Sequence, residues 1–178
     1  PIFRPQYRSG DLVSVMDVID LEVVKHVPYR GYQQENVLVK SVGWEKLWEY
    51  RWDQLDELVD KPTPLWTGAG ERSDRIALDR IAELSSSLRL IQVTDLEISE
   101  VVRQEQIKLK AKFRYESAEY YLSITDPEFE AKYWLNDADN EIISKAYLCI
   151  SIGEPYTVPV TGEKACFKLV ATVITPDM

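Results

Sequence analysis

Four basic residues recur at every second position of "IKLKAKFRYE", a stretch that covers residues 107–116. They are Lys108, Lys110, Lys112 and Arg114. A row of cations can hold the phosphates of a nucleic acid, and exposed aromatic rings beside it can stack the bases. The whole chain of 178 residues carries a formal net charge of -9, so the row contrasts with an acidic background.

A β-strand is the element that positions these residues, because successive side chains of a strand point to opposite faces. The cations then share one face, and the apolar residues between them share the other. A turn at residues 117–118 predicts a hairpin with the following strand, "YYLSI". The register places Phe113 opposite Leu122 and Arg114 opposite Tyr121, which keeps both faces consistent.

The basic face has two interpretations. Lys and Arg can simply solubilise an exposed sheet face and discourage edge-to-edge pairing. Alternatively, the face binds single-stranded nucleic acid, with Lys108, Lys110, Lys112 and Arg114 on phosphates and Tyr121 stacking a base. This segment alone favours the first interpretation, because the net charge of -9 repels nucleic acid at long range.

Patterns that mark catalysis or metal binding do not occur in the sequence. The only histidine, His26, has no Cys or Asp at the spacing of a triad or a metal site. Asp74 and Asp126 are better explained as helix caps than as catalytic acids. "GAGE" lacks the Gly-Lys-Ser/Thr ending of a phosphate-binding loop. We therefore expect no enzyme activity, no catalytic residue, no metal site and no cofactor.

The cysteines and the hydropathy of the sequence indicate the cellular compartment in which the protein is expected. Cys149 and Cys166 lie in apolar segments, which predicts buried free thiols rather than a disulfide. Free thiols are typical of the reducing cytoplasm. No apolar run approaches the ~20 residues of a membrane span, and no signal-peptide pattern opens the chain. We expect a cytoplasmic protein without membrane contact.

Two segments have helical periodicity. Residues 41–60, "SVGWEKLWEYRWDQLDELVD", place acidic side chains on one helical face and apolar ones on the other: Trp44, Leu47, Trp48, Leu55 and Leu58. The apolar face favours a core seam over a ligand-stacking ladder. The acidic face suggests an alternative function, docking of a basic protein partner. A second helix is predicted in "DRIALDRIAEL", with Ser73 as its cap.

The last part of the chain combines one helix with two strands. "TDPEFEAKYWL" predicts a helix that Asp126 caps and in which Pro127 takes the first position. "AYLCISI" and "CFKLVATVI" are apolar and predict paired strands of the core. Four of their residues are expected to be buried: Leu148, Ile150, Leu169 and Val173.

Several segments, in this order, resemble the bacterial dual OB-containing domain: "FRP", "YQQENVLV", "PLW", "SDRI", "SLRLI", "YYLSITDPEFEAKY", "LCISIGEP" and "CFKLVA". The ordered set is more specific than any one motif. The resemblance implies two successive OB-like β-barrels, a fold that often binds nucleic acids or other ligands. It also implies a binding or sensing role, within bacterial defence, rather than catalysis. The loop after Leu65-Trp66 departs from the family pattern.

We therefore predict a mainly β protein with helical insertions, made of two successive OB-like β-barrels. Residues 1–96 form the first half with the Trp-rich helix, and residues 97–178 form the second half with the basic hairpin. The predicted function is a non-enzymatic binding module for single-stranded DNA or RNA. The alternatives are protein docking and a nucleotide-sized ligand between the barrels. Polar residues of the family-like motifs are a second set of candidate contacts: Arg4, Gln34, Asn36 and Arg75.

Overall fold

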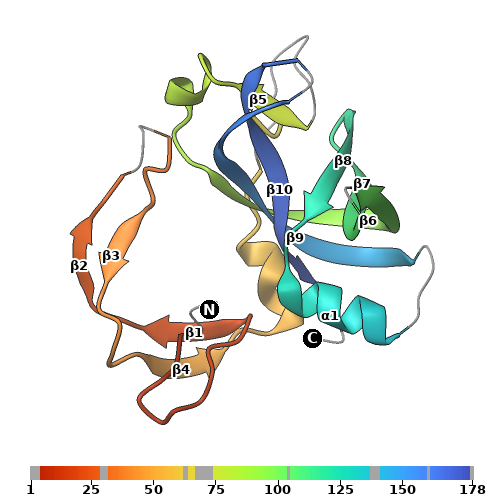
Figure 1. Cartoon of the computed structure of the whole chain (residues 1–178). Coiled ribbons are helices and arrows are strands. Elements are labelled where there is room, and N and C mark those ends of the chain that lie inside the picture. Colours follow the sequence, from red (N-terminus) through yellow and green to blue (C-terminus); the bar gives the residue numbers. More distant parts are fainter. Residues whose placement is uncertain are drawn as a thin grey trace.

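A closed five-stranded barrel is the main feature of the computed structural model (Figure 1). The structure describes residues 5–28, 32–61, 64–66, 74–103, 105–136, 141–159 and 161–176. The barrel strands are β6 (Leu88–Arg103), β7 (Gln106–Tyr115), β8 (Ala118–Ile124), β9 (Ile142–Thr157) and β10 (Lys164–Ile174). Their order is β10-β8-β7-β6-β9, and pairing of β9 with β10 closes the barrel.

The topology of this barrel is that of an OB-type fold. Strands β8 and β10 are parallel, and all other neighbouring barrel strands are antiparallel. Helix α1 (Pro127–Leu135) connects β8 to β9. Five strands in a Greek-key barrel, with one helix between the third and the fourth, are the OB arrangement. The mainly β class and one of the two expected barrels are thereby confirmed.

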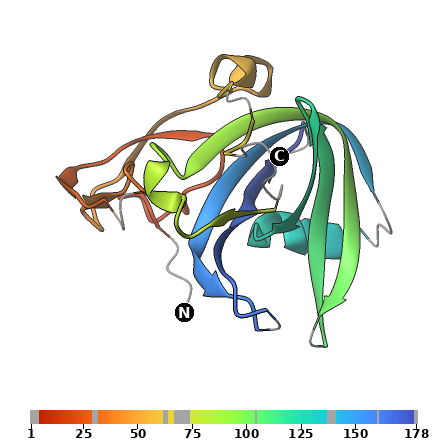
Figure 2. The ribbon, with the colours of Figure 1, turned by 90° about the horizontal axis from the view of Figure 1, so that it is seen from above.

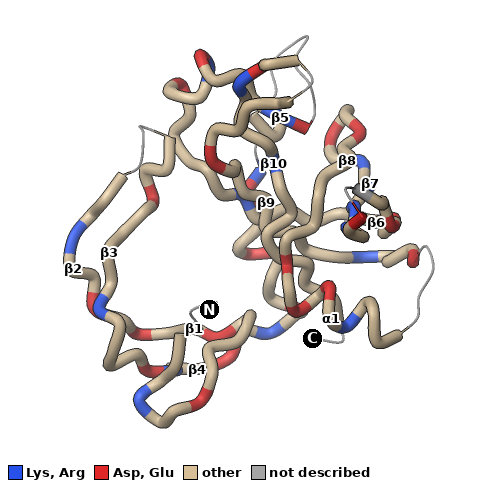
Figure 3. The backbone as a smooth tube through the Cα atoms, viewed as in Figure 1, with Lys and Arg blue, Asp and Glu red and all other residues tan. Residues whose placement is uncertain are grey.

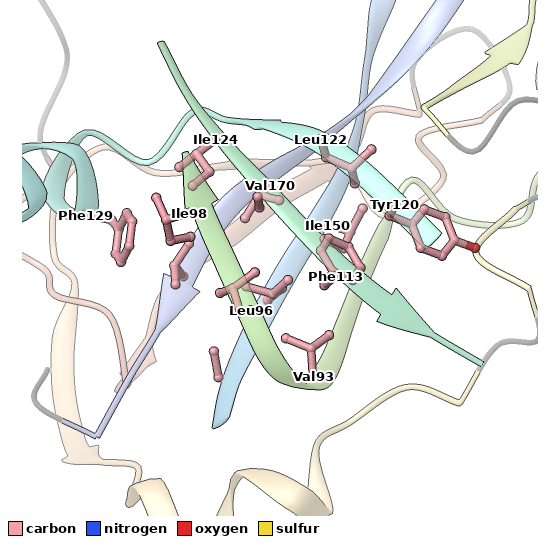
Figure 4. Close-up of a cluster of buried hydrophobic side chains, with 14 of the residues drawn as sticks. Val93, Leu96, Ile98, Phe113, Tyr120, Leu122, Ile124, Phe129, Ile150 and Val170 are labelled. Carbon is pink, nitrogen blue, oxygen red and sulfur yellow. The ribbon is translucent and has the colours of Figure 1, made fainter. Parts of the chain in front are cut away.

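Inward-pointing side chains of the barrel strands form the main core (Figure 4). In β7, Leu109, Ala111 and Phe113 are buried in this core, whereas the cations between them belong to the outer face. Burying a large aliphatic side chain contributes about 1.5–3 kcal/mol relative to leaving it exposed. Figure 4 shows further members of the cluster, including Val93, Leu96, Ile98, Tyr120, Leu122, Ile124, Phe129, Ile150 and Val170.

The expected pairing of the two apolar strands near the C-terminus is confirmed by the β9–β10 ladder. Three of the four residues expected in the core are fully buried: Leu148, Ile150 and Val173. The prediction for Leu169 is wrong, because this side chain is only half-buried. Its neighbours Lys168 and Val170 take the buried positions of β10, and Leu169 packs over Gly153 instead.

Helix α1 begins where the sequence predicts it. The carboxylate of Asp126 caps it and accepts hydrogen bonds from the N–H groups of Glu128 and Phe129, at 3.0 and 3.1 Å. Pro127 takes the first turn. The second oxygen of Asp126 accepts the N–H of Val173 at 3.0 Å, so the cap also ties the helix to β10. Phe129 then reaches the barrel core.

A long antiparallel ribbon, residues 17–26 and 37–49, lies beside the barrel. Its strands are β1 (Asp17–Asp20), β2 (Val23–His26), β3 (Val37–Val39) and β4 (Glu45–Glu49). β1 pairs with β4 and β2 with β3, and a 3.0 Å hydrogen bond from the N–H of Lys40 to the carbonyl of Glu22 joins the two ladders. β2 and β4 are exposed along their whole length, and Figures 1 and 2 show the ribbon arching away from the barrel.

The described residues before β5 form two two-stranded sheets in this ribbon and no second closed barrel, whereas β5 and most of β6, also in the expected first half, belong to the barrel sheet. The hairpin end of the ribbon is fixed to the OB barrel. Tyr32 is fully buried there in a cluster with Ile76 and Ile152. Glu35 accepts hydrogen bonds from the hydroxyl and the N–H of Ser87, at 2.6 and 2.8 Å.

The Trp-rich segment does not form the predicted helix. It forms β4 and then the 3₁₀-helix η1 (Trp52–Glu57). A four-residue spacing fits both periods, because residues four apart share one face of a regular strand as well as one face of a helix. Pairing with β1 favours the strand. Trp48 is 56% exposed. Trp52 instead packs edge-on against Tyr147, with ring centroids 4.8 Å apart, and fixes the second end of the ribbon to the barrel.

The helix predicted in "DRIALDRIAEL" is also wrong. The segment contains strand β5 (Arg75–Ala77) and one 3₁₀ turn, η2 (Ile81–Glu83), and its expected cap Ser73 lies outside the described residues. β5 pairs antiparallel with residues 165–167 of β10, which satisfies its backbone groups in a ladder. The barrel sheet thus gains a sixth strand. The expected division at residues 96–97 falls within β6, and the two-domain organisation stays a prediction.

Candidate nucleic-acid interface

The basic row lies on the outer face of the β7–β8 hairpin, as the alternation predicts. The pairing differs by two residues from the predicted register: Lys112 lies opposite Tyr121, and Arg114 lies opposite Glu119. Residues 116–117 form the turn, one position earlier than expected. A shift of two residues leaves every side chain on its predicted face, because the side-chain period of a strand is two.

Lys110 is the most enclosed cation of this row, with 9% exposure. Its Nζ donates a hydrogen bond to Oγ of Ser123 at 2.8 Å and lies 5.3 Å from the centre of the Tyr121 ring. The ring itself is 44% exposed. Together, Lys110 and Tyr121 present a positive charge and an aromatic surface, the two groups that a single strand needs.

The other basic residues of the row lie in a mixed-charge surface. Nζ of Lys112 lies 3.1 Å from a carboxylate oxygen of Glu97 on β6, and this hydrogen-bonded partner raises the pKa of Lys112. Arg114 faces Glu119 across the ladder, and Lys108 lies at the exposed start of β7. Figure 3 shows acidic and basic residues interspersed over β6, β7 and β8. The face is not a continuous basic stripe.

Arg75, from the second set of candidates, reaches the same region from β5. Its guanidinium carbon lies 4.5 Å from the centre of the Phe167 ring. Its Nε and Nη2 donate to the two carboxylate oxygens of Asp74 at 3.0 and 2.7 Å, and these hydrogen bonds raise the pKa of Arg75. Nη1 lies 3.5 Å from Glu163. A stacked, bidentate guanidinium of this kind is fixed in orientation.

A cleft of about 710 Å³ lies between β5, the hairpin and the facing ends of β9 and β10. It brings together Lys110, Tyr121 and Arg75. Tyr156, which is 53% exposed, also lines it and meets Phe167 edge-on, with ring centroids 6.1 Å apart. A cleft of this size with two exposed rings suits a nucleobase and its sugar. Its other lining residues are Asp74, Leu122, Ser123, Gly153, Glu154, Val158, Pro159, Phe167, Lys168 and Leu169.

Sequence reasoning missed the contribution of β9 and β10 to the cleft. Phe167 lies in the segment "CFKLVATVI", which has the composition of a core strand, and Tyr156 lies beyond the end of the predicted strand "AYLCISI". Lys168 is only 1% exposed, and its Nζ lies 5.7 Å from the centre of the Tyr120 ring. A lysine in the apolar run "CFKLVATVI" was the available signal, because lysine is almost never fully buried without a specific partner.

The other residues of the second set do not join this cleft. Arg4 lies outside the described residues. Gln34 and Asn36 lie at the hairpin end of the ribbon, where the carbonyl of Gln34 contacts Nε2 of His26 and Nδ2 of Asn36 donates to Gln33 at 3.0 Å. Both of these contacts lie within the hairpin of the ribbon, whereas the neighbouring residues Tyr32 and Glu35 contact the barrel.

The cysteines and the potential metal ligands were the other candidates for a reactive site. Both cysteines are free thiols, with Cys166 buried and Cys149 half-buried, and burial raises the pKa of Cys149. Among the residues that the structure describes, no group of three or more His, Cys, Asp or Glu is placed to hold a metal ion. The described helices are all too short or too polar to cross a membrane.

Comparison with known proteins agrees with the topology. Neither the curated proteins nor the solved structures gave a match to the chain. A protein-family model described as a dual OB-containing domain matches residues 4–173. The matched range includes the ribbon and nearly all of the OB-type barrel. The chain therefore belongs to the family of dual OB-containing domains.

Proposed function

We propose that the chain is a non-enzymatic binding module that holds single-stranded nucleic acid in the cleft beside β7 and β8. The observation that carries this proposal is the convergence of Lys110, Tyr121 and Arg75 on one cleft from two separate segments. In OB-type barrels, oligonucleotides bind on the face of the second and third strands and on the loop between the fourth and fifth. Here these parts are the β7–β8 hairpin and the β9–β10 connection.

Bases and phosphates have different partners in this proposal. Tyr121 and Tyr156 offer stacking surfaces, and each stacked base contributes about 1–3 kcal/mol. Lys110 and Arg75 supply positive charge for the flanking phosphates. Because Arg75 and Lys112 already pair with carboxylates and the chain has a net charge of -9, the electrostatic share of binding is small. Affinity therefore depends mainly on stacking.

Fluorescence anisotropy with labelled oligothymidine and oligouridine, each at low and high salt, tests the proposal. The wild-type chain is expected to bind at micromolar concentrations, and Tyr121→Ala is expected to weaken binding. Trp48→Ala is the matched control, because Trp48 is an exposed aromatic residue on the ribbon rather than in the cleft. Absence of binding to every single strand would end this proposal.

A second candidate function, docking of a protein partner, is favoured by the exposed ribbon. Large apolar side chains are exposed along it: Val23, Val24, Leu38, Leu47 and Trp48. The acidic residues first expected to attract a basic partner are partly engaged, since Asp53 pairs with Arg51 at 2.6 Å and Asp56 accepts the hydroxyl of Tyr147 at 2.7 Å. A partner that is lost with Leu47→Lys but retained with Tyr121→Ala would support docking through the ribbon.

A free nucleotide is the remaining alternative, because the 710 Å³ cleft is also large enough for one. Competition of mononucleotides against a labelled oligonucleotide separates the two ligands: a mononucleotide that binds as tightly as the oligonucleotide would favour the smaller ligand. The family resemblance further suggests sensing in bacterial defence, and the two free cysteines suggest the cytoplasm as its place. Binding of a single strand in the cleft would then be the recognition step.

A further inference from the structure

The cleft contains a carboxylate that the packing of the protein does not use. Glu154 lines the cleft from the end of β9, and its side chain is exposed. It forms no hydrogen bond or ion pair with another residue of the described structure. The other acidic residue of the lining, Asp74, already holds Arg75 with both of its oxygens. Glu154 is therefore the acceptor that is available to a ligand.

Glu154 is also placed close to a stacking surface. Tyr156 follows it by two positions on β9, so the two side chains lie on the same side of the strand, and both line the cleft. Two residues of a strand span about 6.6 Å, which is comparable to the length of a purine. A base that stacks on Tyr156 can therefore present its hydrogen-bonding edge to the carboxylate.

An ionised carboxylate only accepts hydrogen bonds, so it selects bases by their donors. Guanine has two adjacent donors on its Watson–Crick edge, N1–H and the N2 amino group, which match the two oxygens of one carboxylate. Cytosine and adenine each present one amino group beside a ring nitrogen that is an acceptor. In thymine and uracil, two carbonyl oxygens flank the single N–H and repel a carboxylate.

We propose that the cleft is a guanine subsite, in which the base stacks on Tyr156 and Glu154 accepts hydrogen bonds from N1–H and the N2 amino group. This inference rests on the proposed binding of single strands and adds base selectivity to it. It also gives the acidic side chain in the cleft a role that phosphate binding alone does not require.

The test uses labelled oligothymidine in which one central base is replaced by guanine, hypoxanthine, cytosine or adenine. A single guanine per strand avoids quadruplex formation. The guanine oligonucleotide is expected to bind about tenfold more tightly than oligothymidine, which lies within the range of discrimination that a good bidentate contact provides. Hypoxanthine, which lacks the N2 amino group, is expected to give an intermediate affinity.

Glu154→Gln tests the named acceptor, and Glu100→Gln, an exposed acid of β6 outside the cleft, controls for the same change in charge. Glu154→Gln is expected to reduce the guanine preference to less than twofold and to leave the affinity for oligothymidine close to that of Glu100→Gln. Thermal melts check that both variants fold. A guanine preference that survives Glu154→Gln overturns the role of Glu154.

The outcomes separate this inference from the proposed function. Equal affinity for all five oligonucleotides overturns the guanine subsite but leaves single-strand binding in place. Failure of every oligonucleotide to bind overturns both. A preference for guanine that disappears with Glu154→Gln and persists with Glu100→Gln supports both.

Discussion

The ammonium group of Lys110 lies 5.3 Å from the ring centre of Tyr121, and both side chains border the same cleft. The hydrogen bond from Lys110 to Ser123, at 2.8 Å, holds the charge beside the ring. A ligand therefore meets charge and ring as one unit, and removing either group should produce a different change in binding.

Tyr121→Ala should reduce affinity for single-stranded DNA or RNA by about 1–3 kcal/mol, because it removes a stacking surface. The salt dependence of binding should change little, since stacking releases few counterions. Anisotropy titrations over a series of salt concentrations measure both quantities. If the logarithmic salt slope of binding became flatter by the value of one full phosphate contact, a stacking role for this ring would be contradicted.

Glu97→Gln should strengthen binding, because it frees Lys112 from the ion pair at 3.1 Å. The logarithmic salt slope for a single strand should become steeper by up to about 0.7, the value of one additional phosphate contact. Lys112→Gln should flatten the wild-type slope by less than that amount, since the carboxylate already neutralises this cation. Glu100→Gln serves as the charge control. Equal effects of Glu97→Gln and Glu100→Gln would mean that the pair does not restrain Lys112.

Ile150→Ala should lower the free energy of unfolding by about 2–5 kcal/mol, because it leaves a cavity in the barrel core. Leu169→Ala should cost clearly less, since this side chain is half-buried at the rim of the cleft. Urea unfolding of the two variants provides the comparison. A larger loss for Leu169→Ala would place that residue in the core, against the structure.

Leu55→Ala should destabilise the attachment of the ribbon, because Leu55 is buried in a cluster with Tyr147 and Ile174. Trp48→Ala should change stability by less than about 0.5 kcal/mol, as is usual for exposed positions. Thermal melts and limited proteolysis near residues 50–60 report on the two variants. Comparable destabilisation by both substitutions would indicate that Trp48 is covered in solution.

The contact between Glu35 and Ser87 should depend on pH. Burial raises the pKa of Glu35, but hydrogen bonds from the hydroxyl and N–H of Ser87 outweigh it, and the net pKa lies below its usual 4.5. A carboxyl group with a lowered folded-state pKa stabilises the fold above its unfolded pKa and loses that contribution as the pH falls through the folded value.

Glu35→Gln should therefore be less stable than wild type at neutral pH, and the difference should shrink as the pH falls below 4.5. Urea unfolding over this pH range measures the difference in the free energy of unfolding between the two proteins. The contributions of the other carboxyl groups cancel, because both proteins contain them. A difference that stays constant with pH would show that the charge of Glu35 does not contribute to the contact.

Local sequence patterns predicted some elements of this fold correctly. They failed where the same residues fit both the period of a helix and the period of a strand. The Asp126 cap and Pro127 identify α1, because both types are specific to the start of a helix. The spacing of Trp44 and Trp48 does not distinguish a strand from a helix, and only the partner strand β1 decides. The hairpin turn includes Glu116 at φ 53°, a conformation usually marked by Gly or Asn, so its position was not evident.

The sequence predicted only the part of the candidate site that lies on the β7–β8 hairpin. Alternation along β7 places Lys110 on the outer face, and the hairpin brings Tyr121 close to it. Arg75 joins them through the pairing of β5 with β10, segments far apart in the sequence. Glu154 and Tyr156 lie on β9 just after the apolar segment "AYLCISI", and the sequence gives no sign that the strand continues to them or that they border a cleft. Contacts of this kind require the closed barrel.

Strand β10 has a consequence for biosynthesis. It pairs with β5, β8 and β9 and follows all three along the chain. A nascent chain that has not yet exposed β10 outside the ribosome cannot close the barrel, and its unpaired strand edges can hydrogen-bond to other chains. Asp126 also lacks its connection to β10 at this stage, because the hydrogen bond to its second carboxylate oxygen comes from the N–H of Val173. Translational pausing before residue 164 should therefore increase aggregation, and chaperone binding to the open β8 and β9 edges should reduce it.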